Sequence, residues 1–196
     1  MGDRRLLLVG GSAGAGKTTV ARALARELQA GWLQLDTLWI AAQDAVQKDS
    51  ATYRALRVDE FIKNSAAPIE ELVARHVEAS RLVCKMLPRA LQFELQTHET
   101  LVADGAWLLP EFVATLTFED AAVAAVFIHE PEFEEVRRTM DARREVKMVA
   151  PWHERSAHVS WSYGNYLADE AVRLGLPVVS ARPRETLLAR VRARPK

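Results

Sequence analysis

The chain of 196 residues carries 26 basic and 26 acidic side chains, so its formal net charge is zero, and 49% of its residues are hydrophobic. This length is typical of one α/β domain with a sizeable core. The balanced charge argues against general binding to nucleic acid or to a membrane surface. The single cysteine, Cys84, cannot form an internal disulfide and favours a reducing cytoplasm, with a buried helical thiol as the expectation. No apolar run has the length of a secretion signal or a membrane span, so we expect a cytoplasmic protein without a membrane partner.

A strand, a glycine-rich loop and a helix follow one another in residues 4–25. Residues 4–9 form a short apolar run, as expected for a strand buried on both faces. Val20, Leu24 and Leu28 recur at fourfold spacing, which places them on one helix face. Between these segments the sequence matches the phosphate-loop (Walker A) pattern G-x-x-x-x-G-K-[ST] at every fixed position. The loop residues are Gly11, Ser12, Ala13, Gly14, Ala15, Gly16, Lys17 and Thr18, followed by Thr19.

The residue types of this loop suit a nucleotide. Glycines permit positive φ angles, which bring backbone N–H groups against phosphate oxygens, and the following helix adds its positive amino-terminal end. Lys17 is placed to reach the β- and γ-phosphates and Thr18 to bind Mg²⁺, so we predict ATP and Mg²⁺ as cofactors. The dinucleotide pattern G-x-G-x-x-G does not fit, because Thr19 occupies its third glycine position.

The rest of the chain alternates between strand-like and helix-like segments. We predict strands at residues 32–36, 100–104, 122–129 and 176–180. We predict helices at residues 37–47, 68–95, 131–145, 159–174 and 183–194, with short helices within 49–64 and up to 116, and a loop at 146–157. Pro88 should kink or split the helix of residues 68–95. This alternation indicates a three-layer α/β/α fold with five parallel strands.

In a parallel sheet, ligands bind at the carboxyl ends of the strands. Asp36, Asp104, His129 and Ala181 are predicted to lie there, on the side of the phosphate loop. Asp36 could orient an acceptor hydroxyl or accept its proton, or it could cap the following helix. Asp104 could be a water-mediated partner of Mg²⁺ or a turn-forming residue before Gly105. His129 is more typical of packing than of ligand binding.

Two further patterns narrow the class of phosphate-loop protein. Neither Asn64 nor Asn165 begins the N-K-x-D motif that GTPases usually carry. Asp104 is followed by Gly105 and not by the glutamate that polarises water in motor-type ATPases. Transfer of a phosphoryl group to a bound acceptor is therefore favoured over hydrolysis.

Together, the phosphate loop, Asp36, the Asp104-Gly105 pair and the Ala181-Arg182-Pro183 turn resemble the small P-loop kinases. That group includes adenylate-kinase-like enzymes, shikimate and gluconate kinases, and chloramphenicol phosphotransferase. Residues 104–110 and 128–131 are more particularly similar to 2-phosphoglycerate-kinase-like proteins. The loop has Ala13 where adenylate kinases usually have proline.

The resemblance implies one kinase domain over residues 1–196, with a helical acceptor-binding region at residues 37–99 and a lid at residues 130–157. It also implies roles for individual residues. Asp36 would face the acceptor and Asp104 would lie on the magnesium side, while the glycines, Lys17, Thr18 and Thr19 would cradle the phosphates. The Arg182-Pro183 turn would border the adenine.

Arg137 and Arg144 of the lid are seven residues apart, which places them on one helical face. An arginine there would neutralise charge on the moving phosphoryl group, so both are predicted as catalytic. The alternative is a solvated face, because Glu134 and Asp141 lie within helical pairing distance. Three side chains of the same region could cap the acceptor or anchor the base of the lid: Trp152, His153 and Trp161.

The sequence thus predicts a cytoplasmic ATP-dependent kinase that phosphorylates a hydroxyl of a small metabolite. Phosphorylated acids, sugar acids, aminoglycoside-like compounds and nucleotides stay open as acceptors, and so does the oligomeric state. The alternatives are a phosphate-loop ATPase or regulatory nucleotide-binding protein without an acceptor, and a nucleoside monophosphate kinase. A closed, polar pocket of acceptor size beside Asp36 would favour the kinase, whereas a flat surface would favour an interaction protein.

Overall fold

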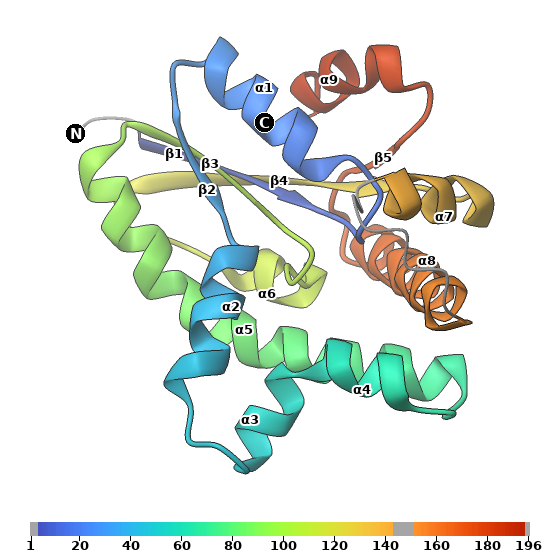
Figure 1. Ribbon diagram of the computed structural model, residues 1–196. Helices are drawn as coiled ribbons and strands as arrows, with labels where there is room; N and C mark the ends of the chain where they lie inside the picture. Colours follow the sequence, from blue (N-terminus) through green and yellow to red (C-terminus); the bar gives the residue numbers. More distant parts are fainter. Residues whose placement is uncertain (1–3, 143–150, 195–196) are drawn as a thin grey trace.

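The computed structural model describes residues 4–142 and 151–194, and their strands form one parallel sheet (Figure 1). The sheet has five strands in the order β2-β3-β1-β4-β5, as predicted in number and direction. In the register, Val9 of the central strand lies beside Asp104 on one side and Val126 on the other. The bounds are β1 Arg4–Gly10, β2 Gly31–Gln34, β3 Thr100–Gly105, β4 Ala121–His129 and β5 Val178–Ser180.

Helices cover both faces of the sheet and complete the three predicted layers. Figure 1 shows α1 and α9 on one face, and α5, α6 and α8 on the other. Leu6 and Leu8 of β1 pack in the core with α5 and α8, whereas Leu7 and Val9 pack with α1 and α9, as the two-residue period of a strand requires. The bounds are α1 Lys17–Glu27, α5 Ile69–Thr97, α6 Pro110–Thr115, α8 Pro151–Arg173 and α9 Arg184–Arg192.

Three short helices between β2 and α5 extend away from the sheet on the side of α5 (Figure 1). They are α2 (Asp36–Ala45), α3 (Ala51–Leu56) and α4 (Val58–Asn64). They make up, with α5, the region of residues 37–99 that the sequence assigns to the acceptor, and that assignment stays a prediction. On the carboxyl side of β4 lies α7 (Phe133–Ala142), the described part of the expected lid together with the start of α8.

The structure corrects two expected boundaries and shows which of the two outcomes predicted for Pro88, a kink or a split, occurs. The second strand ends at Gln34, and Asp36 is already the first residue of α2. The residues 151–157 expected in a loop belong to α8, which begins at Pro151; proline is favoured in the first turn of a helix, where its missing N–H is not needed. Pro88 does not split α5, which continues as one helix that changes direction along its length (Figure 1).

The continuity of α5 has a physical reason. Pro88 removes the hydrogen bond to the carbonyl of residue 84, but the neighbouring Leu87 and Leu91 have no exposed surface and pack in the main core. Burial of two leucines offsets the loss of one backbone hydrogen bond. Although α5 and α8 are 29 and 23 residues long, no helix among the described residues is apolar enough over a sufficient length to cross a bilayer.

Candidate active site

The phosphate loop connects β1 to α1 in a conformation that its glycines make possible. Gly14 and Gly16 have φ angles of 85° and 95°, in the left-handed region that side-chain-bearing residues rarely adopt. A Cβ atom at Gly11 would lie 2.3 Å from the Ile128 carbonyl oxygen, and one at Gly16 would lie 2.5 Å from Arg184 Nη1. Gly16 immediately precedes α1, whose free N–H groups open onto the loop. The loop therefore has the open backbone conformation that its glycines allow, and binding of a nucleotide's phosphate chain there stays a prediction.

Lys17 lies folded over the loop and is almost fully buried. Its Nζ donates a hydrogen bond to the Ser12 carbonyl oxygen at 3.0 Å. An ammonium group in this position meets the side of the loop to which phosphates bind in such motifs. The role of Lys17 toward the β- and γ-phosphates stays a prediction.

Thr18 and Asp104 meet at the start of α1, as expected for residues on the magnesium side of the site. Thr18 Oγ1 donates to Asp104 Oδ2 at 2.7 Å, and Trp32 Nε1 donates to Asp104 Oδ1 at 2.8 Å. Burial raises the pKa of Asp104, while these two hydrogen bonds and the charge of Lys17 oppose the rise. Asp104 lies within β3, so the alternative of a turn-forming residue is wrong. Trp32 was not singled out from the sequence, since it is separated from Asp104 by 72 positions.

Asp36 holds the segment that follows β3. Its Oδ1 accepts a hydrogen bond from the backbone N–H of Ala106 at 3.1 Å. It neither closes the second strand nor caps α2, because Leu35 occupies the cap position and Asp36 begins the helix. Both local interpretations of Asp36 are therefore wrong, whereas its role toward an acceptor stays a prediction.

The Ala106 peptide is held from its other side by α8. Tyr163 donates its hydroxyl to the Ala106 carbonyl oxygen at 3.1 Å and lies 2.9 Å from Ser80 Oγ. Burial raises the pKa of Tyr163 far above its usual range, so its hydroxyl stays protonated. Asp36 and Tyr163 together fix both hydrogen-bonding groups of Ala106.

Helix α8 also contacts the phosphate loop directly. Ser160 Oγ donates to the Ala13 carbonyl oxygen at 3.0 Å. One turn further on, a Cβ atom at Gly164 would lie 2.6 Å from Ser12 Oγ, so only glycine permits this approach. The loop is therefore supported by the helix that follows the expected lid.

A cavity of about 220 Å³ lies between the phosphate loop, the Ala106 peptide and the helices α4, α5, α7 and α8. Both Ala13 of the phosphate loop and Ala106 are part of its wall, so it lies directly beside the loop. Its lining residues are Ala13, Asp59, Ile62, Lys63, His76, Ala106, Met140, Ser156, Val159, Ser160 and Tyr163. Asp36 does not line it but reaches its wall through Ala106.

His76 is a residue of this wall that the sequence did not single out. Its ring stacks on Trp107, with 4.6 Å between ring centroids, and lies 4.2 Å from the ring of Tyr163. Burial and, to a lesser extent, the charge of Lys17 lower the pKa of His76 to about 4, so the imidazole is neutral at physiological pH. On α5 it is spaced with the apolar residues, so periodicity alone marks it as a packing residue.

The described part of the lid pairs its arginine with neighbouring acids. Arg137 donates to Glu134 at 2.7 Å and lies 3.8 Å from Asp141, with its side chain 47% exposed. These contacts raise the pKa of Arg137, and none of them brings it to the phosphate loop. Its catalytic role stays a prediction. Arg144 lies outside the described residues.

The base of the lid is attached to α8. Trp161 Nε1 donates to the Pro131 carbonyl oxygen at 2.8 Å, and its ring packs edge-on against Phe133. Trp161 thus anchors the chain as it leaves β4. The side chains of Trp152 and His153 lie outside the described residues. His129 packs against Asn165, with Nε2 2.8 Å from Oδ1, which agrees with its expected packing role.

The turn that would border the adenine is linked to the phosphate loop by a buried carboxylate. Arg184 donates to the carbonyl oxygens of Gly14 and Ala15 at 3.0 and 2.5 Å, and to Glu130 at 3.3 Å. Arg182 donates to the same Glu130 oxygen at 3.1 Å. The Glu130 side chain has no exposed surface. Sequence reasoning missed Glu130 and Arg184 as parts of the site, because their partners are far away in the chain.

The structure also locates Pro183 and Cys84, and its described residues can be searched for a metal site made of protein side chains alone. Pro183 precedes α9. Cys84 is a buried helical thiol, as expected; it donates to the Trp107 carbonyl oxygen, and burial raises its pKa to about 12. Over residues 4–142 and 151–194, no three His, Cys, Asp or Glu side chains are placed to hold a metal ion. The role of Thr18 as a ligand of Mg²⁺ stays a prediction.

Comparison with known proteins supports this arrangement at the level of the fold. The model of the Zeta toxin family matches residues 3–82, which is less than half of the chain. A gluconokinase from Sinorhizobium meliloti 1021 superposes with a TM-score of 0.51 at 15% identity, covering 98% of this chain and 91% of that one. A shikimate kinase from Aquifex aeolicus vf5 gives a TM-score of 0.48 at 17% identity, covering 96% and 94%. No curated protein matches the chain in sequence.

The protein therefore has the α/β fold of the small P-loop kinases, as the motifs predicted. At 15% identity the likeness to the gluconokinase establishes the fold and not the substrate. What the chain acts on has to be inferred from its own site.

Proposed function

We propose that the protein is an ATP-dependent kinase that transfers the γ-phosphoryl group of ATP to a hydroxyl of a small molecule. The observation that carries this proposal is the cavity of about 220 Å³ whose wall includes both Ala13 of the phosphate loop and Ala106. A kinase needs an acceptor site beside the end of the phosphate chain, since phosphoryl transfer depends mainly on positioning and charge.

The residues around the loop have separate proposed roles. The loop residues 11–19 bind the phosphates, Arg182 and Pro183 border the adenine, and Thr18 with Asp104 would hold Mg²⁺. The metal would neutralise charge on the phosphates, and the Lys17 ammonium adds its own positive charge. A new bond forms between the acceptor oxygen and the γ-phosphorus, and the bond from phosphorus to the ADP oxygen breaks. The hydroxyl proton passes to Asp36 through a water molecule, since Asp36 contacts the cavity wall at Ala106 and does not line the cavity. Arg137 and Arg144 add positive charge when the lid closes.

Two features support transfer over hydrolysis. Asp104 is followed by Gly105, so the water-activating glutamate of motor-type ATPases is missing from that position. The space beside the loop is a walled cavity and not the flat surface that a regulatory nucleotide-binding protein would present to a partner.

The size and chemistry of the cavity disfavour a nucleoside monophosphate as acceptor. About 220 Å³ is below the range of about 300–1,000 Å³ that larger ligands occupy. Among the described residues that line it there is no arginine, the side chain best suited to a second phosphate group. A small metabolite without a nucleoside fits better.

The test is ATP consumption across a library of small hydroxylated metabolites, with Lys17→Ala protein as the control. We expect at least one compound to raise ADP production above the hydrolysis background in wild-type protein, and no compound to do so in the folded control. If no compound raises turnover, or if Lys17→Ala turns over as fast as wild type, the kinase function is refuted.

A further inference from the structure

Arg184 holds the two carbonyl groups of the phosphate loop that come just before α1. Its Nη1 donates to the Ala15 carbonyl oxygen at 2.5 Å, and its Nη2 donates to the Gly14 carbonyl oxygen at 3.0 Å. The contact is close, because a Cβ atom at Gly16 would lie 2.5 Å from Arg184 Nη1. One guanidinium group thus fixes two consecutive peptide groups of the loop, which its planar fork of donors makes possible.

The orientation of these carbonyl groups determines where the N–H groups of the loop point. In a trans peptide group the C=O and N–H bonds point in opposite directions. Because Arg184 holds the Ala15 carbonyl oxygen, the N–H group of Gly16 is directed away from the guanidinium, to the other side of the loop. Backbone N–H groups are the groups that cradle phosphates in loops of this kind. Arg184 therefore acts on the phosphate-binding groups of the loop from the opposite side of its backbone.

A buried carboxylate keeps Arg184 in this place. Glu130 Oε2 accepts from Arg184 Nη2 at 3.3 Å and from Arg182 Nε at 3.1 Å, and the Glu130 side chain has no exposed surface. A buried carboxylate persists only where cations and hydrogen bonds compensate for its lost hydration. Because Glu130 immediately follows the last residue of β4, this carboxylate attaches Arg184 to the sheet.

The position of Arg184 in the chain opposes the local preferences of a helix. It is the first residue of α9, where the positive end of the helix dipole disfavours a cation. Its distant partners, Glu130 and the two loop carbonyl groups, offset this disadvantage. Residues that contradict a local rule in this way are typical of functional sites.

We propose that Arg184, held by Glu130, is a positioning residue that presets the phosphate loop for the phosphates of ATP. It acts through the backbone of the loop and not by contact with the nucleotide. This inference rests on the proposed function only for the binding of ATP, and it is independent of the acceptor and of phosphoryl transfer. The sign of the Glu130 effect distinguishes positioning from simple attraction between charges. Removal of a carboxylate near the loop strengthens the attraction for an anion, whereas a loop that loses its support binds the anion more weakly.

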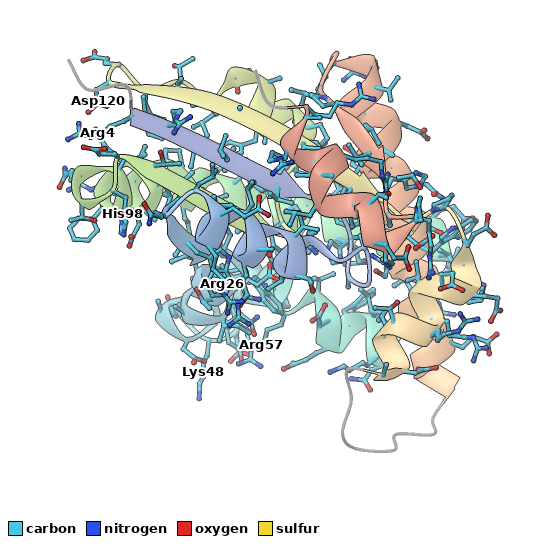
Figure 2. The ribbon with its side chains drawn as sticks, turned by 90° about the horizontal axis from the view of Figure 1, so that it is seen from above. Arg4, Arg26, Lys48, Arg57, His98 and Asp120 are labelled. Atoms are coloured by element: carbon cyan, nitrogen blue, oxygen red, sulfur yellow. The ribbon has the colours of Figure 1, made fainter. Side chains whose placement is uncertain are left out.

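The test is a double-mutant cycle on binding, measured by isothermal titration calorimetry. The probes are a non-hydrolysable ATP analogue with Mg²⁺ and inorganic triphosphate with Mg²⁺. The variants are Arg184→Met, Glu130→Gln and the two combined. The matched control is the cycle of Arg4→Met and Asp120→Asn. Arg4 and Asp120 form an ion pair and lie together at the edge of the sheet where β1 begins (Figure 2), whereas the phosphate loop follows the other end of that strand.

We expect Arg184→Met to raise the Kd of both probes by about tenfold, the scale of one hydrogen bond to a charged group. Glu130→Gln should raise the Kd in the wild-type background and leave it unchanged in the Arg184→Met background, because Glu130 acts through Arg184. Both probes should respond alike, since the loop contacts phosphates and not adenine. The Arg4 and Asp120 variants should bind both probes as wild type does. Melting temperatures show which variants are folded at the temperature of the titration.

Arg184→Lys is a second variant that keeps the charge and the fold. Lysine is a point charge and cannot hold two carbonyl groups and a carboxylate in one fork, so Arg184→Lys should bind both probes nearly as weakly as Arg184→Met. Wild-type affinity in Arg184→Lys would show that charge alone matters and would overturn the inference.

Three further results overturn the inference and leave the kinase function standing. They are an unchanged Kd in Arg184→Met, tighter binding in Glu130→Gln, and a loss confined to the ATP analogue, which would assign the effect to the adenine side through Arg182. If wild-type protein binds neither probe, both proposals fail. If no acceptor in the metabolite library is phosphorylated but the cycle gives the expected pattern, the kinase function fails and this inference stands.

Discussion

Replacement of Asp36 by asparagine separates a chemical role of this residue from a structural one. Asparagine keeps an oxygen where Asp36 Oδ1 accepts the hydrogen bond from the Ala106 N–H, so the segment after β3 stays attached. Two stabilising effects decrease. A hydrogen bond to a charged group is worth about 1 kcal/mol more than one between neutral groups, and a carboxylate in the first turn of α2 contributes about 0.3–1 kcal/mol through the helix dipole. Because Asp36 is partly exposed, we take the lower end of each of these two ranges. We therefore expect the free energy of unfolding to decrease by about 1 kcal/mol.

For a chain of this length, that loss corresponds to a decrease in Tm of roughly 2–4 °C, which scanning calorimetry measures directly. Acceptor phosphorylation, followed as coupled ADP production, should fall by about 10² or more if the carboxylate takes the hydroxyl proton. Affinity for ATP should change little, because the phosphates are bound by residues 11–19. An Asp36→Asn protein with the small decrease in Tm but full transfer activity would refute the chemical role and leave Asp36 as the anchor of Ala106.

Three further outcomes are expected. Since the pKa of His76 falls from 6.5 to about 4 on folding, the unfolded state binds the proton first as the pH decreases, and wild-type protein loses about 3 kcal/mol of stability between pH 6.5 and 4, at 1.36 kcal/mol per unit. His76→Phe has no such group, so wild-type protein should lose unfolding free energy relative to this variant across that window, and parallel curves would contradict it. Arg137→Ala breaks exposed ion pairs, so the unfolding free energy should change by less than about 0.5 kcal/mol. A tenfold or greater loss of turnover at unchanged stability would assign Arg137 to the reaction. Cys84 has a pKa near 12, so its thiol should resist iodoacetamide at pH 8 in folded protein and react after unfolding in urea. Rapid labelling of the native state would show instead that the thiol is accessible.

The features predictable from the sequence are those whose causes are local. The phosphate loop is contiguous, and its glycines, Lys17 and Thr18 are recognisable because their spacing alone determines the geometry. The buried strands read as apolar runs, and the alternation with helices is enough to predict a parallel sheet, since parallel strands need crossover connections. Asp104 could be placed for the same reason, because it is the polar residue with which such an apolar run ends.

The remaining features depend on contacts between distant residues. The second strand ends before Asp36 because Leu35 turns into the core beside Gly105, an approach that glycine makes possible. His76 looks like any position on the apolar face of a helix in the sequence, and only the structure shows that it is part of the cavity wall and that its nitrogens have no hydrogen-bond partner among residues 4–142 and 151–194. Trp32 becomes part of the magnesium side only through the pairing of β2 with β3. In each case the decisive neighbour is tens of residues away.

The position of α8 has a consequence for how the two substrates affect each other. This one helix contacts the phosphate loop through Ser160, the Ala106 peptide through Tyr163 and the entrance of the lid through Trp161. Because α8 is one continuous helix, a tilt that changes one of these three contacts also displaces the other two. If the proposed nucleotide and acceptor bind at the loop and in the cavity, both would act on the same helix, and thermodynamic linkage would then require that each ligand change the affinity for the other by the same factor.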